Sequence, residues 1–171
     1  GGSQGAKSFS EVIPKAILKL QSINNIYCSI SHQARKEDLN LVKNIYNSSK
    51  IKSNVQEYFS DMPKRIFESN LVISRSGSST VNEIIYYGKP SILIPYPYAV
   101  DDHQLYNARE LEKRSISKII LNKDLNTQKL YLEILKIFKD ENKRNYITYA
   151  ASKLNNLNSC ERIYDLIKGD L

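Results

Sequence analysis

Short apolar runs alternate with helical patterns along most of the chain. β-rich runs predict strands at Ile26–Ile30, Val55–Phe59, Leu71–Ser74, Ser91–Ile94 and Ser117–Leu121. Their near-continuous apolar character is typical of strands that are covered on both faces. Apolar residues at helical spacing predict helices between the strands, at 38–47, 62–69, 80–87 and 104–113. This alternation predicts an α/β domain with a doubly wound parallel sheet, right-handed crossovers and flanking helices.

The two ends of the chain have different patterns. A glycine-rich turn, GGSQGA at residues 1–6, precedes a helical pattern of apolar residues from Phe9 to Leu20. Such a turn normally joins a strand to a helix, so we expect a strand before residue 1 and interpret the chain as the later part of a longer polypeptide. From Gln128 onward the pattern is helical. No repeat or linker divides the sequence, so residues 1–171 are predicted to form a single domain.

Composition places the chain among ordinary globular proteins. Hydrophobic residues make up 41% of the 171 residues and charged residues 25%, which excludes a disordered or low-complexity chain. Lysine and arginine number 25 against 18 acidic residues, a net charge of +7. The chain is also rich in isoleucine, lysine and asparagine, a bias typical of AT-rich genomes. Part of the positive charge therefore reflects codon usage, and we expect no nucleic-acid partner.

Cysteine usage and hydropathy indicate a cytoplasmic protein. Cys28 and Cys160 are far apart and lie in apolar contexts, so we expect reduced thiols and neither a disulfide nor a metal site. No run approaches the roughly 18 apolar residues that a membrane-spanning helix needs. No charged-then-apolar leader opens the sequence.

Three loops that follow predicted strands have unusual chemistry, and in a parallel sheet such loops line the ligand site. The first is the turn at residues 1–8. It has Gly1, Lys7 and Ser8 in register with a phosphate-binding P-loop, but Ala6 stands where the second glycine belongs. No later strand ends in the aspartate that a magnesium site would need. Two interpretations remain open: an anion site at a helix N-terminus, and a tight turn without a ligand.

The second loop, Ser74–Glu83, joins small hydroxyl residues and a glycine to the start of a helix. Backbone amides and hydroxyl groups presented together suit a diphosphate. Thr80 and Glu83 also fit a capping box, in which the carboxylate accepts from the amide of the capping residue. Alternatively, Glu83 accepts from the two hydroxyls of a ribose, as acidic residues do in nucleotide-binding folds. Gly88 is predicted to end the helix.

The third loop, Pro95–Gln104, contains two prolines and ends in four consecutive polar side chains. Asp101, Asp102 and His103 suggest a metal site, but adjacent residues project in different directions and no second cluster completes a coordination shell. We therefore predict no metal. Charge that complements the helix dipole and hydrogen bonding to a polar ligand such as a sugar both remain open.

Five motifs occur in order along the chain: GGSQGA at 1–6, EYFSDM at 57–62, SRSGSSTVNE at 74–83, GKPSILIPYP at 88–97 and DDHQLYNA at 101–108. In this order and spacing they resemble the MurG family of glycosyltransferases, of family 28 and the GT-B architecture. The resemblance covers essentially the whole chain and corresponds to the family's C-terminal, donor-binding half. It implies transfer of N-acetylglucosamine from UDP-N-acetylglucosamine to a lipid-linked muramyl-pentapeptide, the step from lipid I to lipid II in peptidoglycan synthesis.

The resemblance also implies which residues bind the donor. Ser3 would contact the diphosphate, and Phe59 would lie against the uracil with its backbone at the base edge. Glu83 would hold the ribose, and His103 and Gln104 would hydrogen-bond the sugar hydroxyls. The phosphates would be cradled mainly by the backbone of the residues that open the helix, Ser78, Ser79, Thr80, Val81 and Asn82.

The family reaction inverts the anomeric centre when the C4 hydroxyl of the acceptor attacks, and it needs no metal or other cofactor. Helix dipoles and oriented amides can stabilise the departing UDP diphosphate. The general base and the acceptor site would belong to an N-terminal domain that this sequence does not include. His32 and His103 are the only histidines, and neither lies in a motif that would make it the base. The catalytic residue is therefore not assigned, and the chain alone is expected to bind donor weakly without turnover.

Two other functions fit the same motifs. One is the catalytic subunit of a split enzyme, similar to the eukaryotic pair that adds the second N-acetylglucosamine to dolichol diphosphate. The other is a nucleotide-sugar binding module that is not catalytic. The resemblance further implies a peripheral location on the inner face of the cell membrane. The positive charge fits an anionic membrane surface, although solvated lysines explain it equally well.

Overall fold

The computed structural model describes residues 7–49 and 51–155. Its helices are α1 (Lys7–Asn24), α2 (Leu39–Asn47), α3 (Met62–Glu68), α4 (Ser78–Tyr87), α5 (His103–Lys113), α6 (Thr127–Lys139) and α7 (Glu141–Asn155). Its strands are β1 (Ser29–Gln33), β2 (Lys52–Gln56), β3 (Val72–Ser74), β4 (Ser91–Leu93) and β5 (Ser117–Ile119). Three short 3-10 helices are η1 (Lys36–Asp38), η2 (Val100–Asp102) and η3 (Asn122–Asp124).

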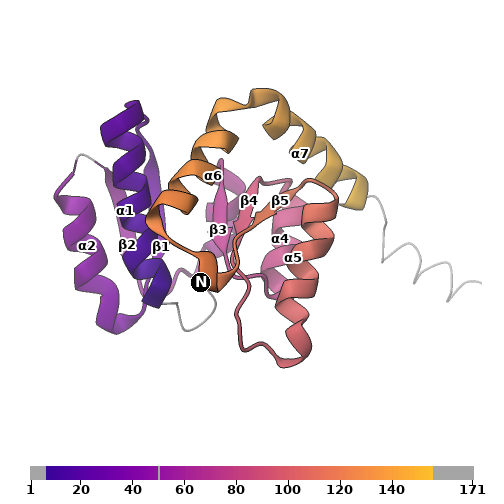
Figure 1. Cartoon of the computed structure of the whole chain (residues 1–171), viewed down its shortest axis with the longest axis horizontal. Coiled ribbons are helices and arrows are strands. Elements are labelled where there is room, and N and C mark those ends of the chain that lie inside the picture. Colours follow the sequence, from indigo (N-terminus) through magenta and orange to yellow (C-terminus); the bar gives the residue numbers. More distant parts are fainter. Residues whose placement is uncertain (1–6, 50, 156–171) are drawn as a thin grey trace, which may run out of the picture.

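All paired strands are parallel, and helices connect them, which confirms the predicted α/β architecture. β1 pairs with β2, and β3, β4 and β5 pair in that order. Figure 1 shows β1 and β2 with α1 and α2 in one half of the molecule, β3 to β5 with α4 and α5 in the other, and α6 between the halves. Within the described residues no ladder joins β1 to β3, so the strands form two sheets. The strand expected before residue 1 lies outside this part of the chain.

Adjacent residues of β4 support two different clusters of buried side chains. Ile92 packs in a cluster with α1, α2 and α6, and Leu93 packs in a second cluster with α4, α5 and α7. Both side chains are fully buried, because successive residues of a strand point to opposite faces and helices cover both faces here. Val55 of β2 shares the first cluster with Ile92, so the two sheets belong to one core.

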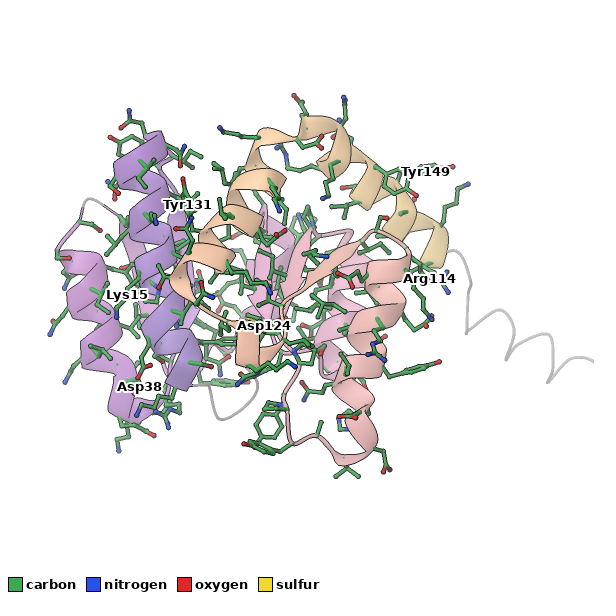
Figure 2. The ribbon with its side chains drawn as sticks, viewed as in Figure 1. Lys15, Asp38, Arg114, Asp124, Tyr131 and Tyr149 are labelled. Carbon is green, nitrogen blue, oxygen red and sulfur yellow. The ribbon has the colours of Figure 1, made fainter. Side chains whose placement is uncertain are left out.

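Helices α1 and α6 hold the two halves together. α1 presents apolar residues at helical spacing, and its stripe of Phe9, Ile13, Ala16, Ile17 and Leu20 is buried. Leu130 and Ile134 of α6 pack in the same cluster. The Tyr131 hydroxyl donates to the side-chain oxygen of Asn24 at 2.8 Å. Figure 2 shows Tyr131 on the side of α6 that faces α1.

Gly88 ends α4 as predicted. It adopts the left-handed conformation at φ 60°, which glycine reaches without strain. The hydroxyl of Thr148 on α7 donates to the Gly88 carbonyl at 3.2 Å. A Cβ at Gly88 would lie 3.4 Å from the Thr148 methyl carbon, an ordinary contact, so it is the left-handed backbone that favours glycine here. This contact packs the C-terminal helix on the half of the molecule that contains β3 to β5.

The first two strands do not lie where the apolar runs predicted. β1 begins three residues later than expected and β2 three residues earlier. Their sequences, SISHQ and KSNVQ, are largely polar, and only His32 and Val55 within them are buried. A continuous apolar run predicts a strand only where helices cover both faces of the sheet, so it did not locate β1 and β2, which are largely exposed. None of the helices in residues 7–49 and 51–155 is both long and apolar enough to cross a membrane.

Candidate functional site

The carboxyl ends of β3 and β4 lie side by side, since the two strands are parallel and Ser74 pairs with Leu93. The loops that follow, at 75–77 and 94–99, lead into α4 and, through η2, into α5. Figure 1 shows the loop between β4 and α5 at the lower edge of the molecule, where α5 begins. The candidate site is built at this edge, as expected for a parallel α/β sheet.

The N-terminus of α4 has free backbone donors. The first helical hydrogen bond runs from the Val81 amide to the Gly77 carbonyl at 3.0 Å. The amides of Ser78, Ser79 and Thr80 therefore have no acceptor within the helix. Gly77 supplies no side-chain cap, no acidic residue lies in the first turn, and nothing lies within 4 Å of the position of a Gly77 Cβ. This helix end can bind an anion through three amides and the positive end of the helix dipole.

The capping-box interpretation of Thr80 and Glu83 is wrong. α4 begins at Ser78, so Thr80 lies in its first turn and is not the capping residue, which is Gly77. Glu83 consequently lies in the middle of the helix, half-buried, and makes no side-chain hydrogen bond or ion pair with the described residues. The helix start therefore gives no reason for a carboxylate at Glu83.

The other predicted phosphate-binding residues of α4 are not equivalent. Ser78, Ser79 and Asn82 are exposed, and Thr80 is half-buried. Val81 differs, because its side chain packs in the core between α4, α5 and α7 and its amide already donates to Gly77. Val81 therefore offers no group to a ligand.

Gln104, at the start of α5, ties the two loops together. Its side-chain oxygen accepts from the Ser76 amide at 3.3 Å and from the Tyr96 amide at 3.1 Å. Its backbone carbonyl accepts from the Ser76 hydroxyl at 2.7 Å. The Asn107 side chain, one helical turn further, donates to the Ser76 carbonyl at 3.1 Å. Because both partners of the Gln104 oxygen are donors, its amide nitrogen points away from them, and its two protons have no acceptor among the described residues.

His103 and the two aspartates before it form a strained turn. Asp101 and Asp102 have positive φ angles of 49° and 52°, which non-glycine residues rarely adopt. The His103 ring donates through Nδ1 to the Val100 carbonyl at 2.7 Å, which leaves Nε2 exposed as an acceptor when the ring is neutral. Among the residues that the structure describes, no three histidine, cysteine or acidic side chains gather in a way that could hold a metal ion.

Arg75 is a site residue that the sequence interpretation missed. Its guanidinium is largely buried, and Nη1 donates to the carbonyls of Ile94 and Pro95 and to the Asn122 side chain, each at 3.0 Å. The rings of Phe9 and Tyr96 lie 4.8 and 5.6 Å from its Cζ. Burial lowers the pKa of Arg75 from its usual value. Only neutral acceptors surround the cation in the described structure, so it places positive charge at the carboxyl edge of β3 and β4.

Phe59 lies in the loop after β2, and its ring is buried. The Arg65 guanidinium covers the ring at 4.1 Å and is held by Asp61 at 2.8 Å and by the Ser31 hydroxyl at 2.9 Å. Because Phe59 is only 3% exposed, a base would meet the Arg65 guanidinium before it met the ring. Ser3 lies outside the described residues. At the end of β3, the buried Ser74 hydroxyl has no hydrogen-bond partner in the described part of the chain.

Comparison with known proteins gives a consistent result. The chain matches the glycosyltransferase family 28 C-terminal domain over residues 1–167. It is 43% identical over 130 residues to the UDP-N-acetylglucosamine--N-acetylmuramyl-(pentapeptide) pyrophosphoryl-undecaprenol N-acetylglucosamine transferase of Chelativorans sp. (strain BNC1), covering 76% of this chain and 35% of that protein. The Bradyrhizobium sp. (strain BTAi1 / ATCC BAA-1182) protein of the same name is 36% identical, covering 98% of this chain and 46% of its own length.

Solved structures agree with this relationship. Acinetobacter baumannii MurG superposes with a TM-score of 0.78 at 28% identity, over 99% of this chain and 48% of that one. The glycosyltransferase VinC shares the fold, with a TM-score of 0.72 at 13% identity, over 96% of this chain and 39% of that one. This chain thus spans less than half the length of these relatives. Since the family model matches nearly every residue, the chain belongs to the glycosyltransferase family 28 C-terminal domain family.

Proposed function

We propose that residues 1–171 are the donor-binding domain of an inverting glycosyltransferase that uses UDP-N-acetylglucosamine. The acceptor would be the undecaprenyl-diphosphate-linked N-acetylmuramyl-pentapeptide, as in the names of the relatives. The observation that carries the proposal is the open N-terminus of α4 with the unpartnered Glu83 behind it, in a chain of this family. The three free amides suit a diphosphate, and a carboxylate that no group of residues 7–49 and 51–155 uses suits ribose hydroxyls.

The chemical demand of the reaction is to stabilise charge on the departing UDP. As the glycosidic bond to the diphosphate breaks, negative charge grows on the phosphate oxygens. The amides of Ser78, Ser79 and Thr80 point at this charge without any rearrangement, and the dipole of α4 adds to their effect. The buried cation of Arg75 raises the positive potential at the same edge. These groups supply the stabilisation that other enzymes obtain from a metal ion.

The donor sugar would lie against the start of α5. The amide nitrogen of Gln104 donates to its hydroxyls, and the free Nε2 of His103 accepts from them when the ring is neutral. The uracil would lie over the loop that contains Phe59, with the Arg65 plane beside it. Together these contacts would place the anomeric carbon at the open edge of the domain, where a second domain can present an acceptor.

The remaining parts of the reaction would come from an N-terminal domain. That domain would bind the lipid-linked acceptor and carry the general base that removes the proton from its C4 hydroxyl. It would also bring the enzyme to the inner face of the cell membrane, with help from the positive charge of this half on an anionic surface. The isolated chain is therefore expected to bind donor and not to turn it over.

Calorimetric titration of the chain with UDP and with UDP-N-acetylglucosamine tests this proposal. We expect both to bind, the sugar nucleotide more tightly, and transfer to appear after a separately produced N-terminal half of a relative is added. A chain that binds neither compound, alone or with the added half, would contradict the nucleotide site. Binding without transfer in the complemented sample would instead favour a binding module that is not catalytic.

A further inference from the structure

The loop between β4 and α5 exposes aromatic and aliphatic side chains beside the candidate site. Tyr96, Tyr98 and Val100 are 45%, 82% and 74% exposed. The rings of Tyr96 and Tyr98 meet edge to face, with centroids 5.7 Å apart and planes at 75°. We call Tyr96, Tyr98 and Val100 the aromatic loop. Three such side chains at alternate positions of one surface loop form an exposed apolar patch, and such patches usually mark a contact with another molecule.

The backbone of the aromatic loop is fixed, so its side chains are held outward. The Tyr96 amide donates to Gln104, and the amides of Ala99 and Asp102 donate back to the carbonyls of Tyr96 and Ala99 at 3.3 and 3.2 Å. Pro95 and Pro97 restrict the backbone on both sides of Tyr96. A loop held in this way presents its rings with little further loss of entropy on binding.

The chemistry around the aromatic loop selects among possible ligands. Asp101 and Asp102 are exposed directly after it, and the loop itself contains no cation. Two carboxylates disfavour direct contact of this loop with an anionic lipid surface or with a phosphate group, because like charges repel. They favour contact with an uncharged part of a ligand that is rich in hydroxyl donors. A sugar ring meets both demands, since its C–H face packs on an aromatic ring while its hydroxyls donate to the carboxylates.

Position indicates which sugar this would be. Gln104, which is proposed to hold the donor sugar, is bonded directly to the Tyr96 amide, so the aromatic loop continues the donor-sugar site outward. We infer that the aromatic loop adds a contact to the saccharide ring of the acceptor, whose main site would lie on the N-terminal domain, with Tyr98 as the principal contact on this half. This inference rests on the proposed function for the identity of the neighbouring site. Tyr96 also covers the Arg75 guanidinium, whereas the only ring contact of Tyr98 in the described structure is with Tyr96.

Binding of a soluble sugar tests the inference on the full chain. The probe is methyl N-trifluoroacetyl-glucosaminide, observed through its fluorine signal, with UDP-N-acetylglucosamine in excess to fill the donor site. We expect the chain to broaden the fluorine signal. Tyr98→Ala should weaken probe binding by about three- to tenfold, the range for loss of one aromatic contact. Tyr98→Phe should stay within about twofold, because the ring face remains.

Controls separate this inference from the proposed function. Tyr27→Ala removes a similarly exposed tyrosine, which lies just before β1 in the other half of the molecule, and should leave probe binding unchanged. UDP affinity and melting temperature should be the same in Tyr98→Ala as in the unaltered chain. Equal probe binding by the chain and Tyr98→Ala, or no probe binding while UDP binds, would overturn the inference. Loss of sedimentation with anionic phosphatidylglycerol vesicles in Tyr98→Ala, without an effect on the probe, would overturn it in favour of a lipid contact.

A failure of UDP binding would count against the proposed function alone. The same probe, added without nucleotide, then still decides whether Tyr98 contacts a sugar. Binding lost in Tyr98→Ala and kept in Tyr98→Phe supports the aromatic loop as a saccharide site. Binding that is equal in all variants, or absent, rejects it.

Discussion

Ser76 donates two hydrogen bonds to Gln104, one from its backbone to the glutamine side chain and one from its side chain to the glutamine backbone. The Ser76 amide donates to the Gln104 side-chain oxygen at 3.3 Å, and the Ser76 hydroxyl donates to the Gln104 carbonyl at 2.7 Å. The loop after β3 is thereby locked to the start of α5. One glutamine thus both fixes the loops that form the candidate site and keeps two amide protons free for a ligand.

These two roles can be separated by substitution at Gln104. Gln104→Ala removes the acceptor of the Ser76 and Tyr96 amides, so we expect a loss of about 1–3 kcal/mol in the free energy of unfolding. Gln104→Glu keeps an acceptor oxygen for both amides but loses the two donors. It should therefore retain most of the stability and lose affinity for UDP-N-acetylglucosamine, while the affinity for UDP stays unchanged. Urea unfolding and calorimetric titration measure the two effects, and equal affinities of Gln104→Glu and the unaltered chain for the sugar nucleotide would contradict the second role.

Much of this fold was predictable from the sequence where strands are covered on both faces. Ser91–Leu93 was placed within one residue, because its short apolar run is bounded by Pro90 and Pro95, which favours a buried strand over a helix. The β1 and β2 pair was misplaced, since most of its residues are polar and exposed or half-buried. Apolar residues near it, such as Ile26, pack against the core from the turn that precedes β1, and they drew the prediction away from the strand. Periodicity marks burial, and it identifies a strand only when the strand is buried.

The candidate site was likewise predictable only in part. The loop after β3 was located from its hydroxyl and glycine residues, yet the helix start was wrong, because Thr80 and Glu83 fit a capping rule that Gly77 pre-empts with its extended backbone. Arg75 carried no local signal of burial, since an arginine in a polar loop is usually solvated. Its burial depends on three acceptors up to 47 positions away, which only the tertiary structure brings together.

Glu83 provides a test that separates ribose binding from helix stability. Glu83→Gln should weaken UDP binding by about 1–3 kcal/mol, if the carboxylate accepts from both ribose hydroxyls. The melting temperature should not change, because the carboxylate makes no bond within the described structure. The same substitution should have no effect on the binding of 2′,3′-dideoxy-UDP, which lacks the two donors. A drop in melting temperature with unchanged UDP affinity would assign Glu83 to the fold.

Arg75 is expected to matter first for stability. Arg75→Met keeps most of the side-chain volume but leaves the carbonyls of Ile94 and Pro95 and the Asn122 oxygen without their donor. We expect a loss of about 2–4 kcal/mol in the free energy of unfolding, measured by urea titration. Arg109→Met is the matched control, because Arg109 is exposed on α5 and should cost less than about 0.5 kcal/mol. Similar losses for the two variants would show that Arg75 does not hold the loops.

His32 predicts how stability depends on pH. Its side chain is buried in β1, and Nδ1 lies 3.0 Å from the hydroxyl of the fully buried Tyr46. Burial lowers the pKa of His32 from 6.5 to about 4. Between these values the unfolded chain binds a proton that the folded chain does not, so stability is complete above pH 6.5 and falls as the pH drops toward 4. The total loss is about 3 kcal/mol for a shift of this size.

Urea unfolding at several pH values between about 4 and 7.5 checks this prediction. His32→Gln can still hydrogen-bond to Tyr46 but does not titrate, so its stability should change less over this range. If the unaltered chain and His32→Gln show the same pH dependence, His32 is not the group responsible.

The N-terminus of α4 allows a prediction in which stability and binding move in opposite directions. Ser79→Asp places a carboxylate in the first helical turn, which contains no acidic residue. Interaction with the free amides and the helix dipole should raise the free energy of unfolding by about 0.3–1 kcal/mol. The same carboxylate occupies the donors that the diphosphate needs and repels its charge, so UDP affinity should fall at least about tenfold. Asn142→Asp in the first turn of α7 is the matched control, because it adds the same charge at another helix start and should stabilise the chain without affecting UDP. A stabilised Ser79→Asp chain that binds UDP as tightly as before would mean that the phosphates do not use this helix end.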